Sequence, residues 1–385
     1  LQELALTIRA AGGPAYAAAY DRDGADDRGI TAAFLYRTDR LTLAKPTAGD
    51  PVLGSAPTVQ YRADGLLYNA DVQNPKSLNA DLPADVDTST GTDGSDVYTR
   101  APQVARFTVA ASPGASEELT LWAVSNHFSS TPQARVGQRR EQAAYGAAIV
   151  ASIEAADPNA RVVYGGDLNV FPRPDDPIAT SDGTPPSDQL APLYDAGLHN
   201  LWEDLLADAP SAAYSYTFQG QAQTLDQLFV NDPLHGDLVQ MRAAHVNAGW
   251  PAEHAGDGSR GSSDHDPQVA RFRSRAALTV ADASVQEGDR GTAQMVFTAS
   301  VSRPLSTDTP VCATTFDLTA RAGSDYEGVV GCRTLVAGQT SLTIAVPVRG
   351  DKRAEPDERF GLLIVGAPGV RLVDPVGVGT IINDD

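Results

Sequence analysis

The apolar residues of this 385-residue chain change their spacing near residue 275, and this change constrains the fold more than any other feature. Before it, long apolar runs alternate with stretches of helical spacing, a pattern typical of a layered α/β domain. After it, short runs rich in β-branched residues alternate in period two between turns, which is typical of an all-β sandwich. We therefore predict two domains, residues 1–275 and 276–385, with the boundary at about 274–276.

Within the first domain, four apolar runs predict buried strands: FTVAA (107–111), LTLWAVSNHF (119–128), ARVVYGGDLNVF (160–171) and TLDQLFV (224–230). Residues 133–154 predict a helix, because apolar side chains recur there at helical spacing: Val136, Ala143, Ala147 and Val150. The polar segment 69–99 is rich in Asp, Ser, Thr and Gly, and it predicts a long surface loop.

The composition excludes several classes of protein. With 42% hydrophobic residues the chain is not disordered, and it has no apolar run of about 18 residues, so we predict no membrane span. The chain has 49 acidic and 29 basic residues, and a net charge of −20 excludes a non-specific nucleic-acid coat. Excess carboxylates are typical of a protein that binds divalent cations.

The two cysteines, Cys312 and Cys332, lie 20 residues apart in the second domain. This number favours one disulfide in an oxidising compartment over a zinc site, which needs four clustered ligands. We therefore predict a secreted or cell-surface protein. Because the chain starts at Leu1 without a leader, we expect it to be a processed protein or a fragment.

Four polar motifs lie at or inside predicted strands: SNHF (125–128), GGDLN (165–169), TLDQLFV (224–230) and SSDHDP (262–267). Side chains at strand ends of an α/β sheet converge on ligands. The motifs supply His127, Asp167, Asn169, Asp226, Asp264 and His265. Two histidines, three carboxylates and one amide suit hydrolysis of a phosphodiester, which needs an activated water, a metal ligand and donors to the phosphate.

Each motif also has a structural interpretation. A DxN sequence after a strand is commonly a turn or a helix cap, and SDHDP is compatible with a polar loop. His127 lies between apolar residues, as a hydrogen-bonded core histidine would. Asp226 is different, because a carboxylate inside an apolar run needs a buried partner, and His265 can supply one.

In order and spacing, the four motifs resemble the endonuclease/exonuclease/phosphatase family, in particular its secreted bacterial deoxyribonucleases. The resemblance covers about residues 4–273. It includes AAGGPAY (10–16), RGITAAFLYR (28–37), TRAPQVARF (99–107) and HVNAGWP (245–251). It implies an α/β fold, a two-layered β-sandwich flanked by helices with the site at one edge.

The resemblance implies a role for each motif residue. Asp167 would position or deprotonate the attacking water, and Asn169 would hold the scissile phosphate. Asp264 would bind Mg²⁺ or Mn²⁺. His265, oriented by Asp226, would donate to the phosphate. His127 would be a second catalytic histidine and Arg100 a phosphate contact. We expect the other histidines to be surface or loop residues: His199, His235, His245 and His254.

The first residues depart from the family, which has a metal-binding glutamate near the end of its second strand. Glu3 lies in a similar sequence, but Gly12 follows only nine positions later, which is too few for a loop and a helix. LQELALTIRAA instead has the apolar spacing of a helix. We therefore expect residues 1–11 to be the first helix and the metal glutamate to lie upstream, which makes Glu3 the less favoured ligand.

The second domain resembles a Calx-beta domain through VQEGD (285–289), AGSDYEG (322–328), VRGDKRAEPDERF (348–360) and INDD (382–385). By this resemblance, acidic loops at one end of the sandwich would bind Ca²⁺ through carboxylates: Glu287, Asp325, Asp351, Glu355, Asp384 and Asp385. The alternative is that these are ordinary solvated turns.

Together these features predict a secreted, divalent-metal-dependent nuclease that hydrolyses extracellular DNA, with RNA and the choice of endo or exo cleavage left open. Two alternatives remain. One is the same chemistry on a lipid or small phosphate ester, and the other is a non-catalytic calcium-binding surface protein with a remnant nuclease domain. No obligate protein partner is predicted. Segment 69–99 is compatible with a DNA-contacting lid and with an inert insertion.

Overall fold

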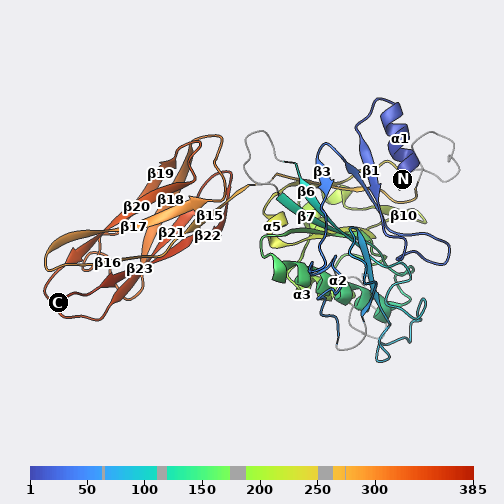
Figure 1. Ribbon diagram of the computed structural model, residues 1–385, viewed down its shortest axis with the longest axis horizontal. Coiled ribbons are helices and arrows are strands. Elements are labelled where there is room, and N and C mark those ends of the chain that lie inside the picture. Colours follow the sequence, from blue (N-terminus) through green and yellow to red (C-terminus); the bar gives the residue numbers. More distant parts are fainter. Residues whose placement is uncertain (63–65, 111–118, 174–187, 250–262, 274) are drawn as a thin grey trace. The chain divides into compact units, whose positions relative to one another are not determined.

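The computed structural model describes residues 1–62, 66–110, 119–173, 188–249, 263–273 and 275–385. They form two compact units, the first made of residues 1–110 and 119–273 and the second of residues 275–385 (Figure 1). Strands predominate and helices are few. Several predictions fall at least partly outside the described residues: the boundary at Ser274, His254, and the ends of segments 107–111, 245–251 and 262–267.

An eight-stranded sheet dominates the first unit, in the order β4–β5–β6–β7–β8–β12–β9 with β3 paired to β6. Its strands are β3 (Leu41–Leu43), β4 (Leu66–Tyr68), β5 (Lys76–Ala80), β6 (Gln103–Val109), β7 (Leu119–His127), β8 (Arg161–Asp167), β9 (His199–Asn200) and β12 (Asp226–Val230). The four runs predicted as strands form β6, β7, β8 and β12. Only β7 and β8 pair in parallel among the bonded neighbours described in this sheet.

Helix α2 (Val136–Ala156) connects the parallel strands β7 and β8, as a crossover connection requires. It confirms the helix predicted over 133–154. On this face of the sheet, Trp122 and Tyr164 pack in one core with Ile149 of the helix. The buried side of α2 also includes polar residues that its apolar spacing did not indicate: Gln138, Arg139, Glu141 and Gln142.

The opposite face of the sheet has its own core. Leu121, Val163 and Leu228 point to it, because neighbouring residues of a strand face opposite sides. This core is completed by α4 (Leu201–Asp208) and the antiparallel pair β13 (Leu238–Ala243) and β14 (Gln268–Phe272). The sheet is thus covered on both faces.

The remaining elements of the first unit are short. They are α1 (Gln2–Ala10), β1 (Tyr16–Ala19), β2 (Phe34–Arg37), α3 (Ala191–Asp195), the 3₁₀ helix Pro210–Ala212, β10 (Tyr216–Phe218), β11 (Gln221–Gln223) and α5 (Asp232–His235). Helix α1 agrees with the predicted first helix, and its Glu3 is exposed to solvent. No helix in the described parts of the chain is long and apolar enough to cross a membrane.

The prediction that residues 69–99 form a surface loop is wrong in part. Lys76–Ala80 form the mostly buried strand β5 between β4 and β6, and Asp81 and Asp96 pair in a β-bridge. Lys76 is fully buried, with its Nζ donating to the carbonyl oxygens of Gly54 (2.5 Å) and Asp71 (3.0 Å). The polar composition misled the prediction because these groups find partners inside the fold.

The second unit is an all-β sandwich, as predicted, with two sheets in the orders β20–β17–β15–β22 and β16–β23–β21–β18–β19. Its strands are β15 (Ala276–Val280), β16 (Ala283–Gln286), β17 (Gly291–Val301), β18 (Thr309–Asp317), β19 (Val330–Leu335), β20 (Ser341–Gly350), β21 (Glu358–Gly366), β22 (Val370–Asp374) and β23 (Val376–Ile382). Phe297, Val346 and Phe360 belong to the core between the sheets. The predicted disulfide between Cys312 and Cys332 is present and joins β18 to β19.

Candidate active site

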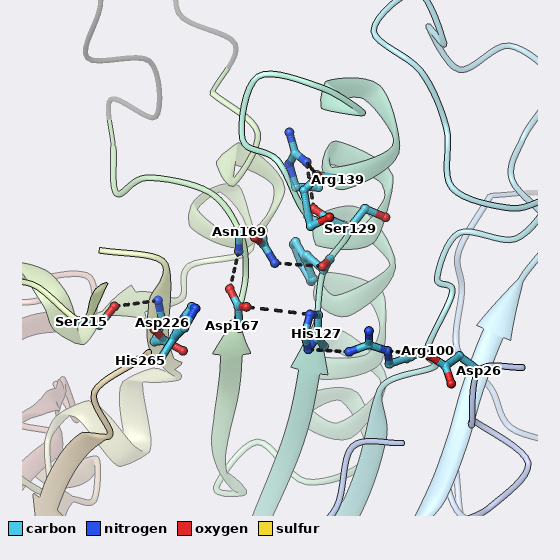
Figure 2. Close-up of polar contacts among 12 residues, drawn as sticks. Asp26, Arg100, His127, Ser129, Arg139, Asp167, Asn169, Ser215, Asp226 and His265 are labelled. Carbon is cyan, nitrogen blue, oxygen red and sulfur yellow. Dashed lines mark hydrogen bonds and ion pairs between the residues drawn. The ribbon is translucent and has the colours of Figure 1, made fainter. Parts of the chain in front are cut away.

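Three neighbouring strands of the main sheet bring three of the predicted side chains into line. In the pairing register, His127 at the end of β7 lies opposite Asp167 at the end of β8. Asp167 in turn lies opposite Asp226, the first residue of the antiparallel strand β12. Figure 2 shows the three side chains at the same edge of the sheet. The sequence expectation that strand ends converge is therefore confirmed for these residues.

Two glycines allow this close alignment. A Cβ on Gly165 would lie 2.2 Å from the carbonyl oxygen of Gln227, and one on Gly166 would lie 2.1 Å from that of Asn126. Gly166 also has φ +143°, which side chains disfavour. The glycines of GGDLN therefore let β8 approach both neighbouring strands just before Asp167.

Asp226 and His265 form a hydrogen-bonded pair, with 2.6 Å between Asp226 Oδ2 and His265 Nδ1. This bond is the largest factor that raises the pKa of His265, against the effect of burial. Ser215 links the two segments that carry this pair through two hydrogen bonds. Its Oγ accepts the backbone N–H of Asp226 (3.1 Å), and its carbonyl accepts that of Asp266 (2.6 Å).

Asp167 lies in a partly desolvated position between the two histidines (Figure 2). Its Oδ1 accepts the backbone N–H of Asn169 at 3.0 Å, and its Oδ2 is 3.8 Å from His127 Nε2. Burial, and then the charge of Asp226, raise the pKa of Asp167 from 3.8 to about 6. Asn169 Nδ2 donates to the carbonyl oxygen of Phe128 (3.2 Å), so its side chain is ordered against β7.

One possible ligand atom from each of Asp167, Asp226 and His265 lies within 4.8 Å of the others. Among the described residues, no other three His, Cys, Asp or Glu side chains come this close. Neither Asp264, the predicted metal ligand, nor Glu3 belongs to this group. Asp264 is exposed, but its charge helps to raise the pKa of His265, so it lies near the group.

His127 is held by Arg100 rather than by a carboxylate. Arg100 Nη1 lies 2.9 Å from His127 Nδ1, and a guanidinium has no acceptor, so Nδ1 must accept this bond. Burial and then the charge of Arg100 lower the pKa of His127 to about 4. At neutral pH the ring is therefore neutral, with its proton on Nε2, the nitrogen that faces Asp167.

Arg100 was predicted to contact phosphate, and in the structure it bridges two protein groups. Besides His127, its Nε donates to Asp26 Oδ2 (3.1 Å), whose side chain is only 5% exposed. A cleft of about 630 Å³ opens beside this chain of contacts, lined mainly by residues 25–28, 93–96, 98–100 and 127–130. The end of segment 69–99 thus forms one wall of the cleft.

Sequence reasoning missed four residues that position the site: Asp26, Arg139, Ser215 and Asp266. Arg139 of α2 is fully buried, and its Nη1 donates to the carbonyl oxygen of Ser129 (2.8 Å), two residues after His127. Nothing in the sequence distinguishes this arginine from its neighbour Arg140. The acidic run around Asp26 likewise has the composition of a solvated loop.

Asp266 follows the catalytic candidate His265 and is nearly fully buried. It accepts the backbone N–H groups of Val246, Asn247 and Ala248 (2.7–3.0 Å) and pairs with His245 Nδ1 (2.9 Å). Burial opposes ionisation, but these bonds outweigh it and lower the pKa of Asp266. His245, predicted to be a surface or loop residue, therefore helps to fix the segment that carries His265.

Acidic residues gather at one end of the second unit, as predicted. Burial, and then the charges of Asp351, Glu355 and Asp384, raise the pKa of Glu287 despite a hydrogen bond from Asn383. Asp384 accepts the N–H of Gly288 (2.9 Å), and a Cβ on Gly350 would lie 1.8 Å from the Gly288 carbonyl. Burial, and then the charge of Asp325, raise the pKa of Glu358. Burial, and then the charges of Asp289 and Asp384, raise the pKa of Asp385.

Comparison with known families assigns the second unit. Residues 273–385 match the profile of the Calx-beta domain, so this part of the chain is a Calx-beta domain, a calcium-binding type. Apart from Arg273, the match lies within the second unit. Among the curated proteins, none matches this chain significantly.

Two solved structures are similar to part of the chain. The apo form of the Calx CBD1 domain is 24% identical, with 29% of this chain and 99% of that chain covered and a TM-score of 0.26. A structure titled calcium binding domain CBD12 of CALX1.1 is 25% identical, with 28% and 44% covered and a TM-score of 0.26.

Proposed function

We propose that residues 1–273 are a divalent-metal-dependent nuclease domain of the endonuclease/exonuclease/phosphatase type, with the two-layered α/β sandwich of that family. The observation that carries the proposal is the alignment of His127, Asp167 and Asp226 on three adjacent strands, with His265 bonded to Asp226. These residues come from four separate motifs, and a purely structural role does not require them to meet at one sheet edge.

The electrostatics of the group suit attack by water on a phosphodiester. Asp167, with its pKa raised to about 6, is ionised at neutral pH and remains basic enough to take a proton from water. His265, whose pKa is raised by Asp226, is the acid of the site and donates to the phosphate oxygens. A partly buried carboxylate, Asp167, and a histidine paired with a second carboxylate, His265, thus provide the base and the acid.

His127 and Arg100 contribute positive potential and a fixed donor. The neutral His127 ring directs its Nε2 proton toward Asp167 or toward a phosphate oxygen that approaches it. Arg100 brings a permanent charge to the wall of the cleft while Asp26 holds its Nε. Asn169 stabilises the turn after β8 by donating its backbone N–H to Asp167 and its side-chain amide to the carbonyl oxygen of Phe128.

The donor set fits Mg²⁺ or Mn²⁺ in a limited way. Mg²⁺ is commonly bound by one or two carboxylates together with substrate phosphates and waters. Asp226 and His265 are engaged with each other and Asp167 is the proposed base, which leaves the exposed Asp264 as the carboxylate of the predicted set for the cation. When bound, the cation would neutralise charge on the phosphate.

We propose DNA as the substrate, because the 245–251 and 262–267 segments resemble those of the secreted deoxyribonucleases. The disulfide of the second unit supports a location outside the cytoplasm. For the Calx-beta domain we propose Ca²⁺ binding by the acidic cluster around Glu287, since a cation would offset the mutual repulsion of its carboxylates.

Cleavage of supercoiled plasmid DNA in Mg²⁺ and Ca²⁺ tests the nuclease. We expect nicking that EDTA stops and that His265→Ala lowers at least about 100-fold. His199→Ala is the matched control, because His199 also pairs with an aspartate, Asp232, but lies outside the site. Equal loss in both variants, or nicking that survives His265→Ala, would refute the assignment.

If plasmid DNA is not cut, the same variants are tested on RNA, on phospholipid vesicles and on a p-nitrophenyl phosphodiester. Hydrolysis of one of these that depends on His265 would keep the chemistry and change the substrate. Inertness toward all of them, in a chain that is folded by circular dichroism, would favour the non-catalytic alternative.

A further inference from the structure

A short hairpin carries aromatic side chains next to the site. Strands β10 and β11 pair antiparallel, and Tyr216 on β10 also forms an isolated β-bridge with His265. The Tyr216 ring lies over the His265 ring, with 4.7 Å between centroids and 33° between planes. Phe218 follows on the same face of the strand, 6.3 Å from Tyr216 and inclined by 16°.

These rings are not ordinary core residues. Phe218 is 50% exposed, and neither ring belongs to a buried cluster of the described residues. The ring contact and the β-bridge with His265 place Tyr216 beside the site, and burial, followed by the charges of Asp264 and Asp167, raises the pKa of its hydroxyl. A row of aromatic rings, tilted by 33° at the first step and by 16° at the second, therefore leads from His265 to the exposed Phe218.

We propose that Tyr216 and Phe218 form a stacking subsite for an unpaired nucleobase adjacent to the scissile phosphate. The inference rests on the proposed function and narrows its substrate to nucleic acid with exposed base faces. Base–aromatic stacking is tolerant of sequence, because every base has a π-face. A lipid headgroup or an alkyl phosphate ester has no planar group that could stack on these rings.

The net charge of the protein explains why stacking would matter for binding. A chain with net charge −20 repels a polyanion over most of its surface, so it gains little affinity from general electrostatic attraction. Stacking is an attraction that does not depend on charge. Since both faces of a base are covered in duplex DNA, the row favours single-stranded or locally opened substrate.

The test compares two labelled oligomers of equal length and charge, dT₁₀ and a chain of ten abasic spacer phosphodiesters. Phe218→Leu keeps an apolar side chain on the hairpin and removes the ring. We expect it to lower the ratio of kcat/KM for dT₁₀ to kcat/KM for the abasic chain by about 5- to 100-fold. Phe316→Leu, at an exposed phenylalanine of the second unit (37% exposed), is the matched control and should leave the ratio unchanged.

Binding separates this inference from the nuclease proposal. The His265→Ala protein, with and without Phe218→Leu, is titrated with fluorescein-labelled dT₁₀ and followed by anisotropy. Loss of dT₁₀ affinity on Phe218→Leu supports the subsite even if no substrate is cut. Cleavage and binding of dT₁₀ that are both insensitive to Phe218→Leu would overturn the subsite and leave the nuclease assignment intact. Equal losses on dT₁₀ and the abasic chain would also overturn it, because they indicate a structural role.

Discussion

Replacement of the central carboxylate, Asp167→Asn, should make the first unit more stable at alkaline pH while it removes activity. In the folded protein the pKa of Asp167 rises from 3.8 to about 6, first through burial and then through the charge of Asp226. Its side chain is only 19% exposed, so solvent screens this effect weakly. The difference corresponds to as much as about 3 kcal/mol of unfavourable free energy in the ionised form.

The direction of the pKa shift determines how Asp167 changes the stability of the fold with pH. Because the folded-state pKa is raised, the folded protein binds the proton more tightly, and Asp167 lowers stability as pH rises from about 4 to about 6. Above pH 6 the cost is constant. Asparagine carries no charge, and its Oδ1 can still accept the Asn169 N–H. The variant should therefore gain about 2–3 kcal/mol at pH 8 and little at pH 4.

Urea unfolding in EDTA, monitored with a probe in the first unit, measures the difference in unfolding free energy between the variant and the wild type at pH 8 and pH 4. The gain must shrink between pH 8 and pH 4, since only the ionised carboxylate is unfavourable. The same free-energy difference at both pH values, or a loss of stability at pH 8, would refute the reasoning. In a plasmid assay, a wild-type activity that does not rise through about pH 6 would contradict the role of Asp167 as base.

Three further predictions concern other contacts. Asp226→Asn removes the strongest acceptor of His265, so the pKa of His265 should fall in an NMR titration and cleavage should drop about 100-fold or more; an unchanged pKa would contradict the pairing. The double variant Cys312→Ser, Cys332→Ser should lose about 2–4 kcal/mol in the unfolding of the second unit, and equal stability would show the bridge to be dispensable. Ca²⁺ should raise the melting temperature of that unit in calorimetry, and Glu287→Gln should reduce the rise; a rise independent of Glu287 would place the ion elsewhere.

The sequence by itself determined the elements and much of the candidate site. Long apolar runs favour burial, so β6, β7, β8 and β12 followed from local pattern, and the sandwich of the second unit followed from period-two alternation. Asp226 inside an apolar run required a partner, and the predicted partner His265 is the one observed. The disulfide could be predicted without a structure, because the chain has only two cysteines.

Only the tertiary structure decided which groups hold these side chains. Arg100 was predicted from its motif to contact a phosphate. The fold also makes it hold the tautomer of His127, 27 positions away, while the buried Asp26, 74 positions away, holds Arg100. Charged residues are usually found at the surface, but three of them are buried here: Lys76, Arg139 and Asp266. They are buried because carbonyl and N–H groups from other parts of the chain form hydrogen bonds with them. Local spacing records which side chains avoid water, whereas a buried polar contact depends on a partner that only the folded chain brings near.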